Sequence, residues 1–504
     1  MRQFVTCCVF LGAFVGTSAA LADESTDVVA ARMRLAESYA SRLAELATWC
    51  DREKLAQEAQ RTRNWSVPRK HDRLYLWLLP VNRLGDELAP GDRRWQERFA
   101  KLRRGQADAL FALVRSAIDA HRVSLASELL LETAHENPDH EEARRLLGYT
   151  DFRGSWRTPF EMRQLTAGKV WHAKWGWLPE AHIARYDRGE RYYRGRWLSA
   201  EEESRLRSDL RRGWRVESEH YVVTTNHSLE EGVRLASQLE RLYGFWQNIF
   251  ARYAIGEKEL VRRLAGSSAD RAAASAKLPK KHNVVQYRTR QQYNDALRAA
   301  QPKIDMTLGI YFDKTQTAHF FAGQDQEPGT IYHEATHQLF QEARPTARQV
   351  GRDRNFWIIE AIACYMESLE DHGGYYTVGG MDTGRLPAAR QRLLADRFYL
   401  PLADLIRLSM SELQTSPEIG MLYSQASGLA AFLMHYDLGR YREALGDYLV
   451  AVYSGRDQID TLPELCGTSS TELDRQYRLF LEDGGLRVDR REARGIGKEP
   501  KSVQ

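Results

Sequence analysis

One pentapeptide in this chain has the residue types of a metal site, His333-Glu334-Ala335-Thr336-His337. Side chains four residues apart on an α-helix share a face, about 6 Å apart along the axis, so both imidazoles could reach one cation. Glu334 would lie beside that cation, where it could take a proton from metal-bound water. This is the HExxH arrangement of zinc metallopeptidases. Because three fixed letters in five also arise by chance, the flanking sequence must support the interpretation.

The flanks predict a helix that starts near Thr330 and has one apolar face. A zinc ion held by two His and one Glu keeps a position open for water, so a third ligand is needed downstream. Glu360 is the best candidate, since it stands in the almost wholly apolar stretch 356–366, where an unpaired acid is costly to bury. The alternative is a carboxylate on the helix surface. Glu367, seven residues later on the same face, could be a ligand, a residue that supports a ligand, or an exposed acid.

These stretches resemble the gluzincin peptidases, in which HExxH and a downstream Glu hold zinc. More narrowly, they resemble the peptidase-MA-like domain of a poorly characterised group of exported bacterial proteins. The matching segments are 306–312, 330–340, 357–367 and 423–429, with 46–50 and 137–149 upstream. The resemblance implies that His333, His337 and Glu360 hold Zn²⁺ and that Glu334 is the general base.

The chain departs from that pattern at two positions after the expected third ligand. Ala361 stands where gluzincins commonly have Gly. Cys364 stands where some of them place an acid that orients a zinc-bound His. Tyr423 opens the last matching segment and is the candidate donor to the oxyanion, with His435 behind it. A tyrosine that only packs between helices is the alternative.

The resemblance also implies the fold class, α+β. It predicts a thermolysin-like catalytic domain with a small mixed sheet and a mainly helical C-terminal part, after a helical, tetratricopeptide-like region. The predicted strands are 220–225, 283–287, 309–312 and 317–322. In gluzincins the strand at the place of 317–322 forms the sheet edge beside the active cleft, where its backbone could pair with an extended peptide.

The N-terminus reads as a secretory signal peptide over residues 1–22. Arg2 precedes the apolar stretch 4–15, and Ala20-Leu21-Ala22 offers a cleavage site. We therefore expect an extracytoplasmic protein, periplasmic or secreted, with no stable membrane span after cleavage; an uncleaved anchor is the alternative. The formal charge of +4 over 504 residues gives no indication of a nucleic-acid partner.

Changes in pattern divide the rest of the chain into four segments. Residues 23–150 are helical and tetratricopeptide-like, and they either recruit a protein partner or pack on the catalytic domain. Residues 151–215 form a Trp-rich module with two R-G-x-W units 41 residues apart, each followed by a helix capping box. Its tryptophans are expected to be core, with sugar stacking as the alternative. Residues 216–485 are the peptidase-like domain, and 486–504 form a basic tail expected to be disordered.

The favoured hypothesis is an exported zinc metallopeptidase that hydrolyses a peptide or protein substrate with metal-activated water and Glu334 as base. A second hypothesis is a non-catalytic extracytoplasmic scaffold or binding protein with a vestigial metal site. The retention of Glu334 argues against it, because a structural site needs no base there. A non-haem iron oxygenase also fits two His and a carboxylate, but not an HExxH helix with a distal Glu.

Overall fold

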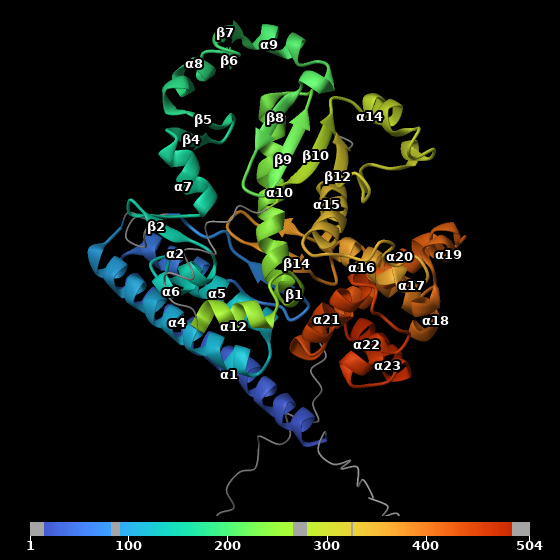
Figure 1. Ribbon diagram of the computed structural model, residues 1–504. Coiled ribbons are helices and arrows are strands. Elements are labelled where there is room, and N and C mark those ends of the chain that lie inside the picture. The colour runs from blue at the N-terminus through green and yellow to red at the C-terminus, as the bar shows by residue number, and fades with distance from the viewer. Residues whose placement is uncertain (1–14, 82–90, 266–279, 324–325, 486–504) are drawn as a thin grey trace, which may run out of the picture.

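The computed structural model describes residues 15–81, 91–265, 280–323 and 326–485, with side chains from residue 28 onward (Figure 1). The basic tail predicted at 486–504, and the signal peptide predicted at 1–22 except for the start of the first helix, lie outside these ranges. The protein is α+β: it is mostly helical, with a five-stranded mixed sheet and several small sheets. Among the described residues, no helix combines the length and the apolar character needed to cross a bilayer.

The N-terminal segment is a layer of helices, as predicted. Its members are α1 (Val15–Arg52), α2 (Ala56–Trp65), α4 (Arg93–Asp119), α5 (Val123–Glu136) and α6 (Glu141–Leu146). Asp92 begins α4 by accepting the backbone N–H groups of Arg94 and Trp95. Helix α5 is buried from residue 123 to residue 134, because it packs against α4 and against three helices of the later segments. These are α10 (Leu229–Ile249), α11 (Ala251–Ala254) and α21 (Arg442–Tyr453). The helical layer and the rest of the protein therefore share a continuous interior.

The Trp-rich module consists of three β-hairpins, each followed by a short helix, and Figure 1 shows them as an arc between the N-terminal helices and the main sheet. The units are β2 (Thr150–Phe152), β3 (Ser155–Arg157) and α7 (Pro159–Thr166); β4 (Lys169–His172), β5 (Gly176–Pro179), η1 (Glu180–His182) and α8 (Ile183–Asp187); and β6 (Glu190–Tyr193), β7 (Arg196–Ser199) and α9 (Ala200–Leu206). Both capping boxes are present, Thr158 with Glu161 and Ser199 with Glu202.

The true repeat of the module is half as long as the sequence comparison suggested. Trp156, Trp177 and Trp197 occupy equivalent second strands and are 21 and 20 residues apart. The sequence of the middle unit does not show the repeat, because it lacks the R-G-x-W turn and has Pro179 where the other units have a capping Thr or Ser. Trp156 is buried, Trp177 and Trp197 are half-buried, and Trp171 in β4 is exposed, so the expectation that the tryptophans are core is confirmed for Trp156 alone among these four.

The main sheet has the order β11-β12-β10-β9-β8. Its strands are β8 (Trp214–Glu217), β9 (Tyr221–Thr225), β10 (His282–Tyr287), β11 (Ile310–Phe312) and β12 (Thr317–Phe321). The three central strands are parallel, and β8 and β11 run antiparallel to their neighbours. The prediction that 317–322 forms the sheet edge is therefore wrong. The chain just before it folds back as a hairpin, so that β11 covers β12 and becomes the edge.

Helices cover both faces of this sheet. On one face, apolar side chains of β8, β9, β10 and β12 pack against α10 (Leu229–Ile249) and α15 (Pro328–Glu342). On the other, a smaller cluster joins the sheet to α14 (Arg290–Leu297) and η3 (Ile304–Met306). Two further helices follow α10, namely α11 (Ala251–Ala254) and α12 (Glu257–Ala265).

The C-terminal part is helical, as predicted. Its helices are α16 (Phe356–Met366), α17 (Leu386–Leu394), α18 (Leu402–Arg407), α19 (Met410–Thr415), α20 (Ile419–Gly439), α21 (Arg442–Tyr453), α22 (Thr461–Cys466) and α23 (Ser470–Glu482). Helix α16 lies between α15 and α20, and all of its residues except Ile359 are buried. The apolar sequence of α16 fits this position, because a helix covered on both sides has no solvated face.

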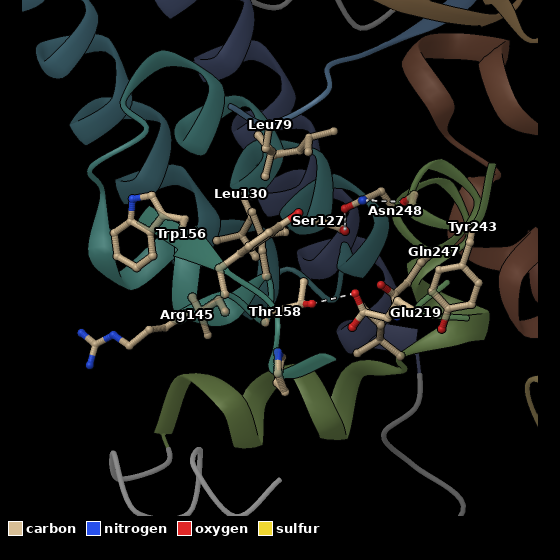
Figure 2. A pocket seen from close by; sticks show the side chains of 18 of the residues that line it. Leu79, Ser127, Leu130, Arg145, Trp156, Thr158, Glu219, Tyr243, Gln247 and Asn248 are labelled. Atoms are coloured by element: carbon tan, nitrogen blue, oxygen red, sulfur yellow. Dashed lines mark hydrogen bonds between the residues drawn. The ribbon is translucent and has the colours of Figure 1, made fainter. Parts of the chain in front are cut away.

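A large cavity of about 1370 Å³ opens between the N-terminal helices, the first hairpin, α10 and α12. Figure 2 shows apolar side chains such as Leu79 and Leu130 on one wall and Tyr243 on another. Among its polar groups, the Thr158 hydroxyl donates to Glu219 at 2.8 Å. The cavity is a feature of the junction between segments far apart in the chain.

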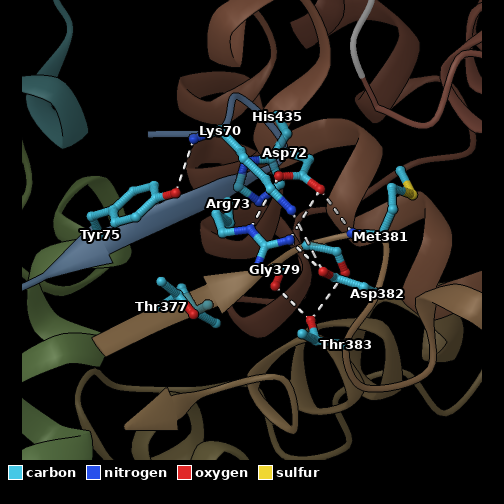
Figure 3. Close-up of polar contacts among 12 residues, drawn as sticks. Lys70, Asp72, Arg73, Tyr75, Thr377, Gly379, Met381, Asp382, Thr383 and His435 are labelled. Atoms are coloured by element: carbon cyan, nitrogen blue, oxygen red, sulfur yellow. Dashed lines mark hydrogen bonds and ion pairs between the residues drawn. The ribbon is translucent and has the colours of Figure 1, made fainter. Parts of the chain in front are cut away.

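A strand from the N-terminal segment is built into the C-terminal part. Strand β1 (Arg73–Leu76) pairs antiparallel with β14 (Tyr376–Gly379), which pairs with β13 (Glu370–Asp371). Beside it, the buried Asp72 accepts the backbone N–H of Met381 at 2.9 Å, and its own carbonyl accepts that of Gly380 at 2.8 Å (Figure 3). The Arg73 guanidinium pairs with Asp72 and with the exposed Asp382. These contacts fix the N-terminal segment to the loop after β14.

We expect Asp72→Ala to lower the free energy of unfolding by about 1–3 kcal/mol, because it removes a buried carboxylate that accepts from the partly buried Met381 N–H and Arg73 guanidinium. Asp382→Ala is the matched control, since it removes the other carboxylate bound by Arg73 from an exposed position and should change stability by less than about 1 kcal/mol. Urea unfolding followed by circular dichroism measures both. Equal losses in the two variants would contradict a structural role for the buried acid.

Candidate metal centre

Helix α15 presents the HExxH residues beside its buried stripe. Pro328 occupies the first turn, where no intrahelical donor is needed, and Ile331, Ala335 and Leu339 recur every four residues in the core. His333 and His337 lie on the adjoining face, toward α16. The helix predicted from the apolar spacing is therefore present, and it begins two residues earlier than predicted.

The structure brings together the three residues predicted as ligands. The Nε2 atoms of His333 and His337 are 3.1 Å apart, and they lie 3.4 and 3.7 Å from Oε2 of Glu360. Ligand atoms about 2.0–2.2 Å from a tetrahedral zinc are separated by about 3.3 Å, so the observed spacings match such a site. This group could hold a metal ion. Its side chains are 13, 16 and 9% exposed, so solvent still reaches the group.

The electrostatics of this group favour a positive charge among the three side chains. Burial by itself would raise the pKa of Glu360, but His337 and His333 outweigh it and hold that pKa well below its usual range. Burial opposes the charged form of His333, yet contacts with Cys364, Glu360 and Glu367 raise its pKa well above the ordinary value. A carboxylate kept ionised in an apolar helix needs a cation close by.

Glu367, for which three roles were open, lies behind His333 and not among the ligand atoms. Its Oε1 is 2.8 Å from Nδ1 of His333, which leaves Nε2 to face Glu360 and His337. Arg385 binds the same carboxylate through Nε at 2.8 Å and through a terminal nitrogen at 3.0 Å. Glu367 therefore orients the imidazole, as carboxylates commonly do behind metal-bound histidines.

This arrangement accounts for the departure at Cys364. The thiol is buried against His333, and the orienting acid stands three residues later, almost one helical turn on. His333, Cys364 and Glu367 are also close enough to share a cation. The guanidinium of Arg385 on Glu367 disfavours a second cation there. Sequence reasoning missed Arg385, for which no motif gave a signal.

Glu334 directly follows His333 in α15, and the edge strand holds its side chain. Its Oε2 accepts the backbone N–H of Tyr311 in β11 at 2.9 Å. Tyr311 lies in segment 306–312, and no motif there marks it as a site residue. Glu334 is not a member of either group of described residues that could hold a metal ion.

Tyr423 comes from α20 and reaches the same group. Burial, then the nearby Glu360 carboxylate, raise the pKa of its hydroxyl, so the phenol keeps its proton at neutral pH and can donate it in a hydrogen bond. Its ring lies 5.9 Å from the Arg385 guanidinium carbon. The structure therefore brings this candidate donor to the site.

His435 does not lie behind Tyr423, and that expectation is wrong. Twelve residues of helix separate the two, about 18 Å along the axis. His435 instead shares a hydrogen bond of 2.8 Å with the Tyr365 hydroxyl and packs against Gly379, in the cluster around β1 (Figure 3). Burial lowers its pKa well below the ordinary value, so it is a neutral core histidine.

The large cavity of Figure 2 is separate from this centre. Among the described residues that line it, none belongs to the ligand group. Its acids have local partners, for example Glu240 with His220 at 2.7 Å. A large pocket is the usual first choice for an active site, but here the reactive side chains converge elsewhere.

Comparison with protein-family models, with curated proteins and with solved structures gives no match for this chain.

We expect His333→Ala and His337→Ala each to abolish stoichiometric metal binding, because two protein ligands hold a divalent ion weakly. Glu367→Gln should keep the metal but weaken its affinity by about 10–100-fold, since the imidazole loses its charged partner. Elemental analysis of the purified variants and competition with a chelator measure these effects.

The control is His372→Ala, an exposed histidine in the turn between β13 and β14. It should bind metal like the parent protein. Full metal content in both ligand variants would contradict the assignment of the site.

Proposed function

We propose that this protein is a zinc-dependent peptidase of the gluzincin type, in which His333, His337 and Glu360 hold the metal and Glu334 is the general base. The observation that carries the proposal is the convergence of these three ligand atoms at tetrahedral spacing, on a helix in which a second carboxylate, Glu334, directly follows the first ligand and is not one of the group. A purely structural ion has no use for that additional acid.

Zinc is the ion that suits this donor set best. Two neutral imidazole nitrogens and one carboxylate form a three-ligand set typical of catalytic zinc, and the remaining position stays open to solvent. The bound ion would lower the pKa of a water molecule and polarise the scissile carbonyl. The partial exposure of the ligands agrees with an open position.

In this proposal, Glu334, Tyr423 and the edge strand have different roles in peptide hydrolysis. Glu334 takes the proton from the attacking water and passes it to the leaving amine nitrogen. Tyr423, which keeps its proton, donates a hydrogen bond to the oxyanion. The free edge of β11 would pair with an extended peptide through backbone groups other than the Tyr311 N–H, which Glu334 binds.

Export from the cytoplasm is part of the same proposal. Its support is the signal-like sequence at residues 1–22. The predicted substrate is accordingly an extracytoplasmic peptide or protein.

Glu334→Gln should keep full zinc content and lose turnover by on the order of 10²-fold or more, because an amide of the same shape accepts no proton. The assay is cleavage of a quenched peptide library by the full mature chain, before and after chelation and zinc restoration. Undiminished cleavage by this variant would contradict the mechanism. A zinc-loaded parent protein without any cleavage would favour the scaffold hypothesis instead.

Tyr423→Phe should lower kcat by on the order of 10²-fold and leave zinc content unchanged, since one oxyanion donor is removed. Tyr399→Phe is the control, because this half-buried tyrosine bonds Asp474, away from the centre. An equal loss in both variants would assign Tyr423 to packing alone.

A further inference from the structure

Tyr311 contacts the HExxH helix at two points, and the two contacts have different partners. Its backbone N–H donates to Oε2 of Glu334 at 2.9 Å, in the middle of α15. Its side-chain hydroxyl donates to Oε1 of Glu342 at 3.2 Å, at the end of the same helix. One residue of the edge strand thus spans two turns of α15.

We propose that Tyr311 is a positioning residue for Glu334: anchored by Glu342, it holds the edge strand so that its N–H fixes the carboxylate of the base. This inference rests on the proposed function, because Glu334 needs a fixed orientation only if it transfers protons. It assigns a task to a residue that neither binds metal nor touches the reacting atoms.

The anchor itself is rigid. The Glu342 side chain is 1% exposed, and it accepts a hydrogen bond from Gln338 at 3.0 Å and lies 3.0 Å from Nδ1 of His282. Burial and then the Glu342 carboxylate raise the pKa of Tyr311, so its hydroxyl remains a donor. A buried acid with several partners cannot follow a moving strand, so the tyrosine that binds it is fixed as well.

The edge strand needs such an anchor. Strand β11 has three residues and pairs with β12 on one side only. Short edge strands with few backbone partners open easily, and the N–H of Tyr311 would move with the strand. Glu334, Gln338 and Glu342 follow one another at four-residue intervals along α15, so the helix presents both attachment points toward β11.

When one oxygen of the Glu334 carboxylate is bound to the strand, the other oxygen remains available to accept a proton. With Oε2 bound to the strand, Oε1 is the atom that can take the proton, and it is held in one place. Displacement of a catalytic group by 1 Å lowers the rate on the order of 10²-fold. Fixing the Glu334 carboxylate should therefore affect kcat more than it affects the free energy of unfolding.

The test is Tyr311→Phe in the full mature chain loaded with zinc, which removes the hydroxyl and keeps the ring and the backbone N–H. We expect hydrogen exchange of the residue 311 amide to become at least about 10-fold faster. We expect kcat to fall on the order of 10-fold with KM and zinc content unchanged. Glu334→Ala should accelerate the same amide, because it removes the acceptor.

Tyr253→Phe is the matched control. This tyrosine is buried and donates to the Phe340 carbonyl of the same helix at 2.7 Å, but it does not touch β11. It should lose similar stability without any change at amide 311 or in kcat. A second pair tests the anchor: Glu342→Gln keeps an acceptor oxygen and should retain kcat, whereas Glu342→Ala should behave like Tyr311→Phe.

Unchanged exchange at amide 311 in Tyr311→Phe would overturn the anchor, whatever the activity. Faster exchange with a kcat equal to that of Tyr253→Phe would overturn the positioning role. A parent protein that binds zinc and cleaves nothing would refute the proposed function and with it the positioning role, and the exchange measurement would still decide whether Tyr311 anchors the strand.

Discussion

The structure depends on one ionised carboxylate inside an apolar helix. Glu360 is buried in α16, between α15 and α20, where little solvent reaches its charge. The two imidazoles of α15 supply that stabilisation, at 3.4 and 3.7 Å. This pairing fixes how α15 and α16 face each other, because a shift by one residue would leave the acid without a partner and expose it to an apolar wall.

Residues around the ligand group hold His333 and Glu334 through further hydrogen bonds and ion pairs. Glu367 and Arg385 hold the far side of His333, and Tyr311 holds Glu334 from the edge strand. The three supporting residues come from different places in the fold. Glu367 directly follows α16, Arg385 directly precedes α17, and Tyr311 lies in β11. Partners of this kind fix the orientation of the ligands and acids at a metal site.

The N-terminal segment, which the sequence divides from residues 216–485, contributes a strand to the structure of that later part. Strand β1 extends the small sheet that follows α16, and the buried Asp72 caps the loop after β14. No local pattern predicts this pairing, since β1 has four residues and its partner lies about 300 residues later in the chain. Strand pairing over such a separation depends on the packing of everything between the two segments.

What the sequence alone determined follows from local periodicity. HExxH placed two histidines and an acid on one helix, the apolar run 356–366 marked Glu360 as an acid that needs a cation, and the capping boxes marked α7 and α9. Each of these depends on neighbours within a few turns of chain. Only the tertiary structure decided that β11 and not β12 is the sheet edge, that Glu367 orients His333, and that His435 belongs to the β1 cluster. These outcomes depend on which distant elements share a surface, and burial and charge pairing settle that only when the whole chain is folded.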